Sequence, residues 1–127
     1  MALRRPPSKL ASPFPDANPI HFSRLIQPVL DRNCVACHVE TKATGAPQLG
    51  SHPVGKLGWS EAYANLIPTL WAHSGGNGII VKNGMRSAPG QIGAAAAPLW
   101  RLLEAGHHDL ALSPEDRKRL SLWLDLN

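Results

Sequence analysis

Apolar residues recur at helical spacing in four segments of the chain, which are separated by stretches rich in glycine and proline. The first segment runs from His21 to Asn33. Its apolar face is formed by Phe22, Leu25, Ile26, Val29 and Leu30. Pro28 lies inside it and either kinks the helix or marks a late helix start. We therefore expect a short amphipathic helix whose C-terminal end leads into Cys34.

Two further helices are predicted in the middle of the chain. Ser60 can cap a helix over residues 61–67, and Pro68 disturbs its end or starts another turn. Residues 95–105 form the next helix, with Gly106 as its C-cap. The apolar side of that helix is formed by Leu99, Trp100, Leu102 and Leu103.

The last helix has the clearest start. Ser113 occupies the capping position and Pro114 the first helical position. Glu115 and Asp116 lie in the first turn, where acidic side chains interact favourably with the positive end of the helix dipole. Its apolar face is formed by Leu120, Trp123 and Leu124. The whole pattern predicts an all-α domain of about four helices joined by long loops.

The segments between these helices have no regular period. Residues 39–59 are rich in glycine and proline and predict a loop, and a small extended piece is expected around residues 79–81. Residues 1–19 contain five prolines and predict an extended linker or arm, because proline fixes φ and removes backbone donors. We therefore expect one domain over residues 20–127.

Composition excludes several classes of protein. A chain of 127 residues with 43% hydrophobic and 17% charged residues fits one globular domain and is unlike a disordered chain. The net charge of +4 is divided equally between residues 1–19 and the rest of the chain. The sequence contains no stripe of basic residues, so it does not predict binding to nucleic acid. No apolar run approaches the ~20 residues of a transmembrane helix.

The only two cysteines lie in the sequence Cys34-Val35-Ala36-Cys37-His38, the attachment signature of c-type haem. Two thiols about one helical turn apart can both add to the vinyl groups on one side of a porphyrin. The next residue, His38, is then held beneath the iron as its proximal ligand. We therefore predict one covalently attached haem c.

Two other uses of the cysteines stay open as alternatives. A redox-active dithiol of the thioredoxin type usually follows a strand, whereas residues 28–33 have the pattern of a helix end. A zinc site could combine Cys34 and Cys37 with two histidines, but the adjacent pair His107-His108 lacks the usual spacing of zinc ligands.

Several segments together resemble the C-terminal cytochrome c domain of proteins related to the hydrazine synthase alpha subunit, which are large secreted bacterial proteins. These segments are Arg4–Ser8, Gln27–His38, Arg86–Gly90, Gly106–Asp109, Leu112–Asp116 and Trp123–Asp125. The resemblance covers nearly the whole chain from Arg4, and its Gly-His and Ser-Pro-Glu-Asp elements are more specific than the haem signature. It implies a cytochrome c-like haem domain at the end of a longer protein. It does not imply hydrazine synthesis, which belongs to a different haem in an upstream domain.

The second axial ligand of the iron has several candidates. Methionine is the usual partner in small cytochromes c, and Met85 lies in a glycine-flanked loop. His107 follows a C-cap glycine that fixes its position, and the resemblance implies a distal histidine there. We predict His107 with Met85 as the fallback, and keep His108, His73 and an open site as alternatives.

This ligand choice decides the expected function. An iron with two histidine ligands cannot bind a substrate without losing a ligand, so it would transfer electrons to a redox partner protein or an upstream haem domain of the same polypeptide. An open site could react with a small nitrogen or oxygen species. No nucleophile elbow is present, and we expect an electron-transfer domain rather than an enzyme.

Covalent haem attachment takes place outside the bacterial cytoplasm, so we expect a periplasmic or otherwise exported protein. Residues 1–7 have no apolar region and do not form a signal peptide. The chain is then either part of a longer exported protein, which the resemblance favours, or begins at an expression start.

Overall fold

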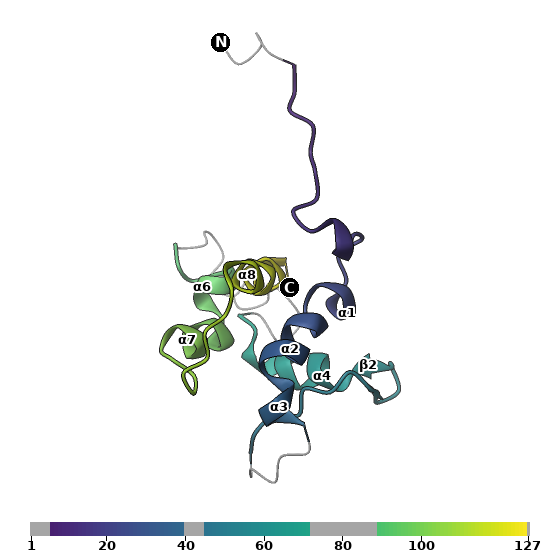
Figure 1. Cartoon of the computed structure of the whole chain (residues 1–127), viewed down its shortest axis with the longest axis vertical. Helices are drawn as coiled ribbons and strands as arrows, with labels where there is room; N and C mark the ends of the chain where they lie inside the picture. The colour runs from purple at the N-terminus through teal and green to yellow at the C-terminus, as the bar shows by residue number, and fades with distance from the viewer. Residues whose placement is uncertain (1–5, 40–44, 72–88, 127) are drawn as a thin grey trace, which may run out of the picture.

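The computed structural model describes residues 6–39, 45–71 and 89–126, and Figure 1 shows their arrangement. They are mainly helical, with one two-stranded antiparallel ladder. The α-helices are α1 (Phe22–Leu25), α2 (Gln27–Asn33), α3 (Val35–His38), α4 (Glu61–Leu66), α6 (Gly93–Ala96), α7 (Pro98–Glu104) and α8 (Pro114–Leu126). The remaining elements are the 3₁₀ helices η2 (Pro15–Ala17) and η3 (Ile67–Thr69) and the strands β1 (Pro53–Val54) and β2 (Trp59–Ser60). None of these helices is long and apolar enough to cross a membrane.

The first predicted helix is divided into α1 and α2. Ile26 separates them, with φ −107° and ψ −44°, and Pro28 lies in the first turn of α2. Pro28 therefore marks a late helix start, where its missing N–H costs no hydrogen bond. The apolar face is retained across the break, because Leu25, Ile26 and Val29 are all buried.

The predicted helix over residues 95–105 is divided in the same way. Ala97 is extended, with ψ 127°, between α6 and α7, because a residue before proline avoids the helical region. Asp125 of α8 caps the start of α6, since its Oδ1 accepts a hydrogen bond from the backbone N–H of Ala94 at 2.7 Å. Gly106 follows α7 with a left-handed φ of 89°.

The β1–β2 ladder lies in the segment for which the sequence predicts a loop. It pairs Pro53 with Ser60 and Val54 with Trp59. Gly55 and Gly58 have φ values of 66° and 65°, and this left-handed backbone allows the chain to reverse between the strands. Ser60 also caps α4, because its Oγ accepts a hydrogen bond from the backbone N–H of Tyr63 at 3.3 Å.

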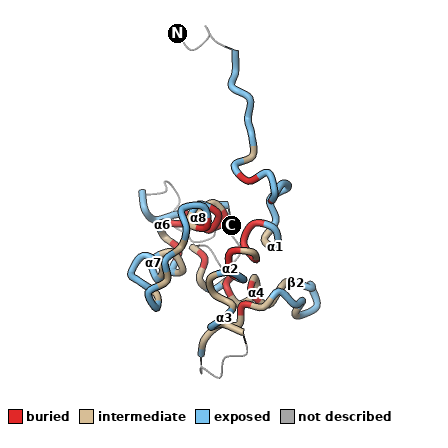
Figure 2. Tube along the Cα trace, in the orientation of Figure 1, coloured by how far each residue is buried: buried red, intermediate tan, exposed pale blue. Residues whose placement is uncertain are grey.

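The core lies where α8 packs against α1, α2 and α6 (Figure 2). The largest fully buried side chains are Leu25, Ile26, Val29, Leu120 and Leu124. Phe22 of α1 makes an edge-to-face contact with Trp123 of α8, with ring centroids 5.2 Å apart. The first and last helical regions of the described chain are therefore packed together.

The packed part of the chain begins before residue 20. Phe14 and Ala17 are buried, and Asp16 pairs with the buried Arg119 of α8 at 2.7 Å. The Arg119 guanidinium also lies over the Phe14 ring, 4.5 Å from its centroid. Residues 6–13 extend away from the helices, as Figure 1 shows.

Candidate functional site

The two cysteines lie at the junction of α2 and α3. The backbone N–H of Cys34 donates to Leu30 O at 2.7 Å, and the N–H groups of Cys37 and His38 both donate to Cys34 O. Helical bonding therefore continues through the junction and separates the two cysteines by one turn. Both thiols are free; Cys34 is half-buried and Cys37 is exposed.

His38 is fixed in a tautomer that suits metal binding. Its Nδ1 lies 2.9 Å from Pro47 O. A carbonyl oxygen only accepts hydrogen bonds, so Nδ1 carries the proton and Nε2 keeps its lone pair. His38 O also accepts a hydrogen bond from the N–H of Leu49 at 2.8 Å, which holds the 45–49 segment against α3.

The structure brings His107 next to His38, although the two residues lie far apart in the sequence. Their ring centroids are 6.0 Å apart, and the ring planes are inclined by 31°. Two imidazoles on opposite sides of one metal ion, with metal–nitrogen bonds of about 2 Å, have centroids about 6 Å apart. The separation of the two rings therefore suits a single shared metal ion.

A left-handed turn holds His107 in this position. His107 lies between Gly106, with φ 89°, and two residues with positive φ, His108 at 50° and Asp109 at 57°. The N–H of Leu110 closes the turn on His107 O at 3.0 Å. Left-handed backbone at non-glycine residues costs about 1–3 kcal/mol each and is concentrated at functional sites.

Burial and the neighbouring imidazoles favour the neutral form of the His107 side chain. Burial lowers the pKa of His107, and the nearby His108 and His38 rings lower this pKa further. A neutral imidazole has the lone pair that a metal ion requires. His108 itself contacts His107, with ring centroids 4.6 Å apart.

The environment of Cys34 is unlike that of a redox-active thiol. Burial raises its pKa to about 11, and electrostatic interactions with Asp116 and Cys37 contribute to the same shift. Reactive CxxC cysteines have lowered pKa values, because the thiolate is the nucleophile. Cys34 therefore stays protonated at neutral pH, which gives the dithiol alternative no support.

Asp116 has a second function that the sequence did not reveal. As predicted, it lies in the first turn of α8, where its backbone N–H donates to Ser113 Oγ at 3.0 Å. Its carboxylate also accepts hydrogen bonds from Arg32 at 2.6 Å and from Asn33 at 3.2 Å. These two residues directly precede Cys34, so Asp116 fastens the attachment segment to α8. No local pattern indicates this pairing.

The remaining candidates are the alternative iron ligands and the ligands of a zinc site. Met85 and His73 lie outside the described residues. Within the described residues, no group of three or more histidine, cysteine, aspartate or glutamate side chains is arranged to hold a metal ion, so they form no zinc site with four protein ligands.

Two buried side-chain atoms have no hydrogen-bond partner within the described part of the chain, Gln27 Oε1 and Trp71 Nε1. The Gln27 amide is otherwise bonded, because its Nε2 donates to Asp31 and to Leu49 O. The Trp71 indole has a single polar atom, so its only donor is left unused.

No family model, curated protein or solved structure matches the chain. The relation to hydrazine synthase-related proteins therefore stays a prediction from the segments quoted above.

Proposed function

We propose that this chain is a c-type haem domain that transfers electrons. Cys34 and Cys37 would attach the haem, and His38 and His107 would bind its iron. The observation that carries the proposal is the 6.0 Å separation of the two histidine rings. A cytochrome c-like fold is part of the proposal, and the packing of α1 and α2 against α8 supports it.

Each residue of the site has a defined task. The free thiols of Cys34 and Cys37 supply the two covalent links from successive turns of one helical segment. His38 offers Nε2 to the iron while its Nδ1–H is held by Pro47 O. When bound, the haem supplies one-electron exchange between ferric and ferrous iron.

We favour electron transfer over catalysis because His38 and His107 would both bind the iron. An iron with two imidazole ligands has no free position for a substrate, so it exchanges electrons without binding one. We propose that the electrons pass to or from a redox partner protein or an upstream haem domain of the same polypeptide. Because haem is attached outside the bacterial cytoplasm, the proposal includes an exported, periplasmic location.

Covalent attachment is tested by expressing the chain in the periplasm with haem-maturation machinery. We expect the purified polypeptide to be heavier by one haem and to keep its Soret band after extraction with acid acetone. The double variant Cys34→Ser, Cys37→Ser should lose the band, whereas Ser51→Ala, a change at an exposed residue, should keep it. Haem that is fully extractable from the wild-type protein would contradict the proposal.

A further inference from the structure

Asp116 holds a buried carboxylate against the segment that leads into Cys34, one of the two attachment cysteines. Its side chain is 9% exposed and accepts hydrogen bonds from the side chains of Arg32 at 2.6 Å and Asn33 at 3.2 Å. Asn33 is also fixed to α2, because its Nδ2 donates to Val29 O at 2.9 Å. The carboxylate therefore has a defined position relative to the attachment segment.

The charge of Asp116 acts on Cys34 in the folded chain. Burial raises the pKa of the Cys34 thiol, and the electrostatic interaction with Asp116 raises this pKa further. Burial also raises the pKa of Asp116, but the hydrogen bonds from Arg32 and Asn33 outweigh this and hold that pKa below its usual value. The carboxylate is therefore charged at neutral pH, and Cys34 lies within its electrostatic field.

The neighbours of Asp116 balance its charge only in part. Within the described part of the chain, its cationic partner is Arg32, whose side chain is 56% exposed. Water screens an exposed charge more strongly than a buried one, so the positive charge of Arg32 acts less on the interior than the negative charge of Asp116. Asn33 is neutral. The group as a whole therefore leaves a negative potential around Cys34.

A negative potential at a haem favours ferric iron over ferrous iron. One-electron reduction by the redox partner lowers the positive charge of the iron centre by one and changes no bond in the protein. A nearby anion is therefore attracted more strongly to the oxidised form, and a low effective dielectric constant makes this difference larger. Attachment at Cys34 would bring the haem into the field of Asp116.

On the basis of the proposed function, we infer that the Asp116 carboxylate lowers the reduction potential of the haem attached at Cys34, and that Arg32 opposes this effect. Asp116 acts through space and is not a ligand of the iron. The two residues form a pair of opposite charges in which the buried member has the larger influence on the haem.

The inference is tested by redox titration of the haem-loaded protein at pH 7, followed in the visible spectrum. Asp116→Asn removes the charge and keeps the size of the side chain. A unit charge about 10–12 Å from the iron, acting through an effective dielectric constant of about 20, changes a redox equilibrium about tenfold. We therefore expect the ferrous-to-ferric ratio at a fixed ambient potential to rise about tenfold, which raises the midpoint potential by about 59 mV.

Arg32→Gln separates the effect of charge from that of structure. It breaks the same ion pair but removes a positive charge, so we expect the ferrous-to-ferric ratio to fall. The change should be smaller, about two- to fivefold, because Arg32 is exposed. A loosened attachment segment would move both potentials in the same direction, whereas the loss of opposite charges moves them in opposite directions.

The matched control is Glu115→Gln. Glu115 precedes Asp116 in the first turn of α8, but its side chain is 65% exposed, so its loss should change the ratio less than twofold. This variant removes the same unit of charge as Asp116→Asn. It therefore separates a local effect of the buried carboxylate from a general effect of net charge.

An unchanged potential in Asp116→Asn, or shifts of the same sign in Asp116→Asn and Arg32→Gln, would overturn the inference and leave the haem proposal standing. If Asp116→Asn does not fold, Arg32→Gln decides alone, and a potential equal to or above that of wild type overturns the inference. A wild-type protein without covalent haem would instead overturn the proposed function.

Discussion

Asp116 is the residue that ties the start of α8 to the segment before Cys34. Its side chain is only 9% exposed and accepts hydrogen bonds from Arg32 and Asn33. Burial raises the pKa of Asp116, but the hydrogen bonds from Arg32 and Asn33 outweigh this and hold the pKa below its usual value. The folded state therefore favours the charged form of Asp116.

The variant Asp116→Asn should destabilise the haem-loaded protein at pH 7 by about 1–3 kcal/mol, because it removes the charged acceptor of the half-buried Asn33 amide and of the Arg32 guanidinium, which is exposed. Because the folded-state pKa lies below the unfolded value of about 3.9, this stabilisation is complete above that pH and is lost as the pH falls through the folded-state pKa. Urea unfolding of both proteins between pH 7 and pH 2 measures the difference.

The matched control for Asp116 is Glu104→Gln. Glu104 pairs with Arg117 at the surface, where both side chains are about half exposed, so its loss should change the unfolding free energy by less than about 1 kcal/mol. A stability difference for Asp116→Asn that persists unchanged at pH 2 would show that the carboxylate charge is not the cause.

At the scale of elements, the turn that follows α7 decides where His107 lies. Gly106 has φ 89°, and a Cβ added there would meet no atom within 4 Å. A larger residue at this position is therefore disfavoured by the left-handed backbone alone and not by a steric clash. Gly55 in the β1–β2 turn is similar, with φ 66° and the same open surroundings. The two glycines form a matched pair, one beside the site and one away from it.

We expect Gly106→Ala and Gly55→Ala each to lower stability by about 1–2 kcal/mol, the cost of left-handed backbone for an L-residue. Only Gly106→Ala should also move His107 and so reduce the low-spin fraction in the visible spectrum of the ferric protein. Equal spectra for the two variants would show that the Gly106 turn does not position the ligand.

The local signals in the sequence predicted the caps well and the helix boundaries less well. Ser60 and Ser113 both accept the expected capping hydrogen bonds, because a cap depends only on residues three positions apart. The break at Ala97 was missed, because the alanine-rich run before Pro98 has high helix propensity and obscures the proline boundary. The short β1–β2 ladder was missed because its two-residue strands are too short to show a period.

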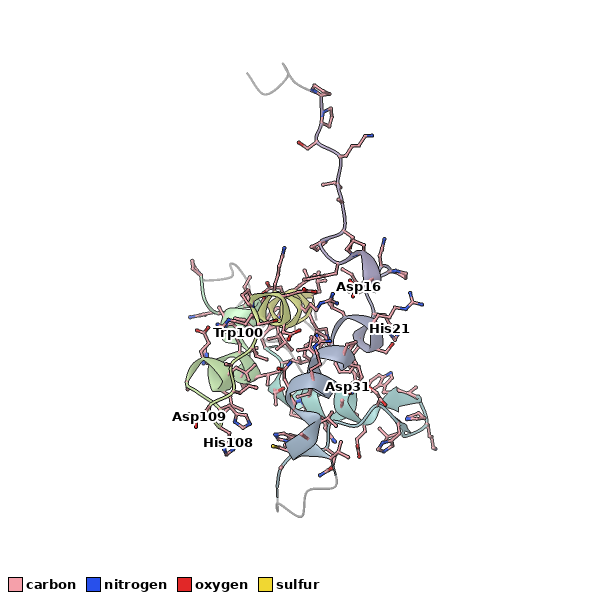
Figure 3. All side chains as sticks on the ribbon, in the orientation of Figure 1. Asp16, His21, Asp31, Trp100, His108 and Asp109 are labelled. Atoms are coloured by element: carbon pink, nitrogen blue, oxygen red, sulfur yellow. The ribbon has the colours of Figure 1, made fainter. Side chains whose placement is uncertain are left out.

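At the scale of the whole molecule, the chain around η2 forms part of the fold on the side away from the site. Phe14 is buried against α8 under the guanidinium of Arg119. Figure 3 shows Asp16 and His108 at opposite ends of the helical body. Packing at η2 should therefore support the fold without affecting the iron ligands.

Phe14→Ala should lower the unfolding free energy by about 2–4 kcal/mol, close to the range for truncating a buried aromatic side chain. The visible spectrum of the folded haem protein should stay unchanged. Leu10→Ala is the control, since Leu10 is fully exposed in the extended arm and its loss should affect neither property. A changed haem spectrum in Phe14→Ala would contradict the separation of η2 from the site.

The contacts between distant segments could not be predicted from residue patterns. Periodicity shows which face of a helix is apolar but not which helix covers it, so the bond from Arg32 to Asp116 had no signal. Residue spacing alone could not pair His38 with His107 either; the glycine before His107 and the family resemblance singled it out. The 6.0 Å separation of their rings is a property of the folded chain.

The most direct test of the account is the spin state of the ferric haem protein, measured by visible and electron paramagnetic resonance spectroscopy. We expect a low-spin, bis-histidine signal for wild type and for the neighbouring control His108→Ala, and a high-spin signal for His107→Ala, because that variant loses the sixth ligand. An unchanged low-spin signal in His107→Ala would contradict the assignment of His38 and His107 as the two axial ligands.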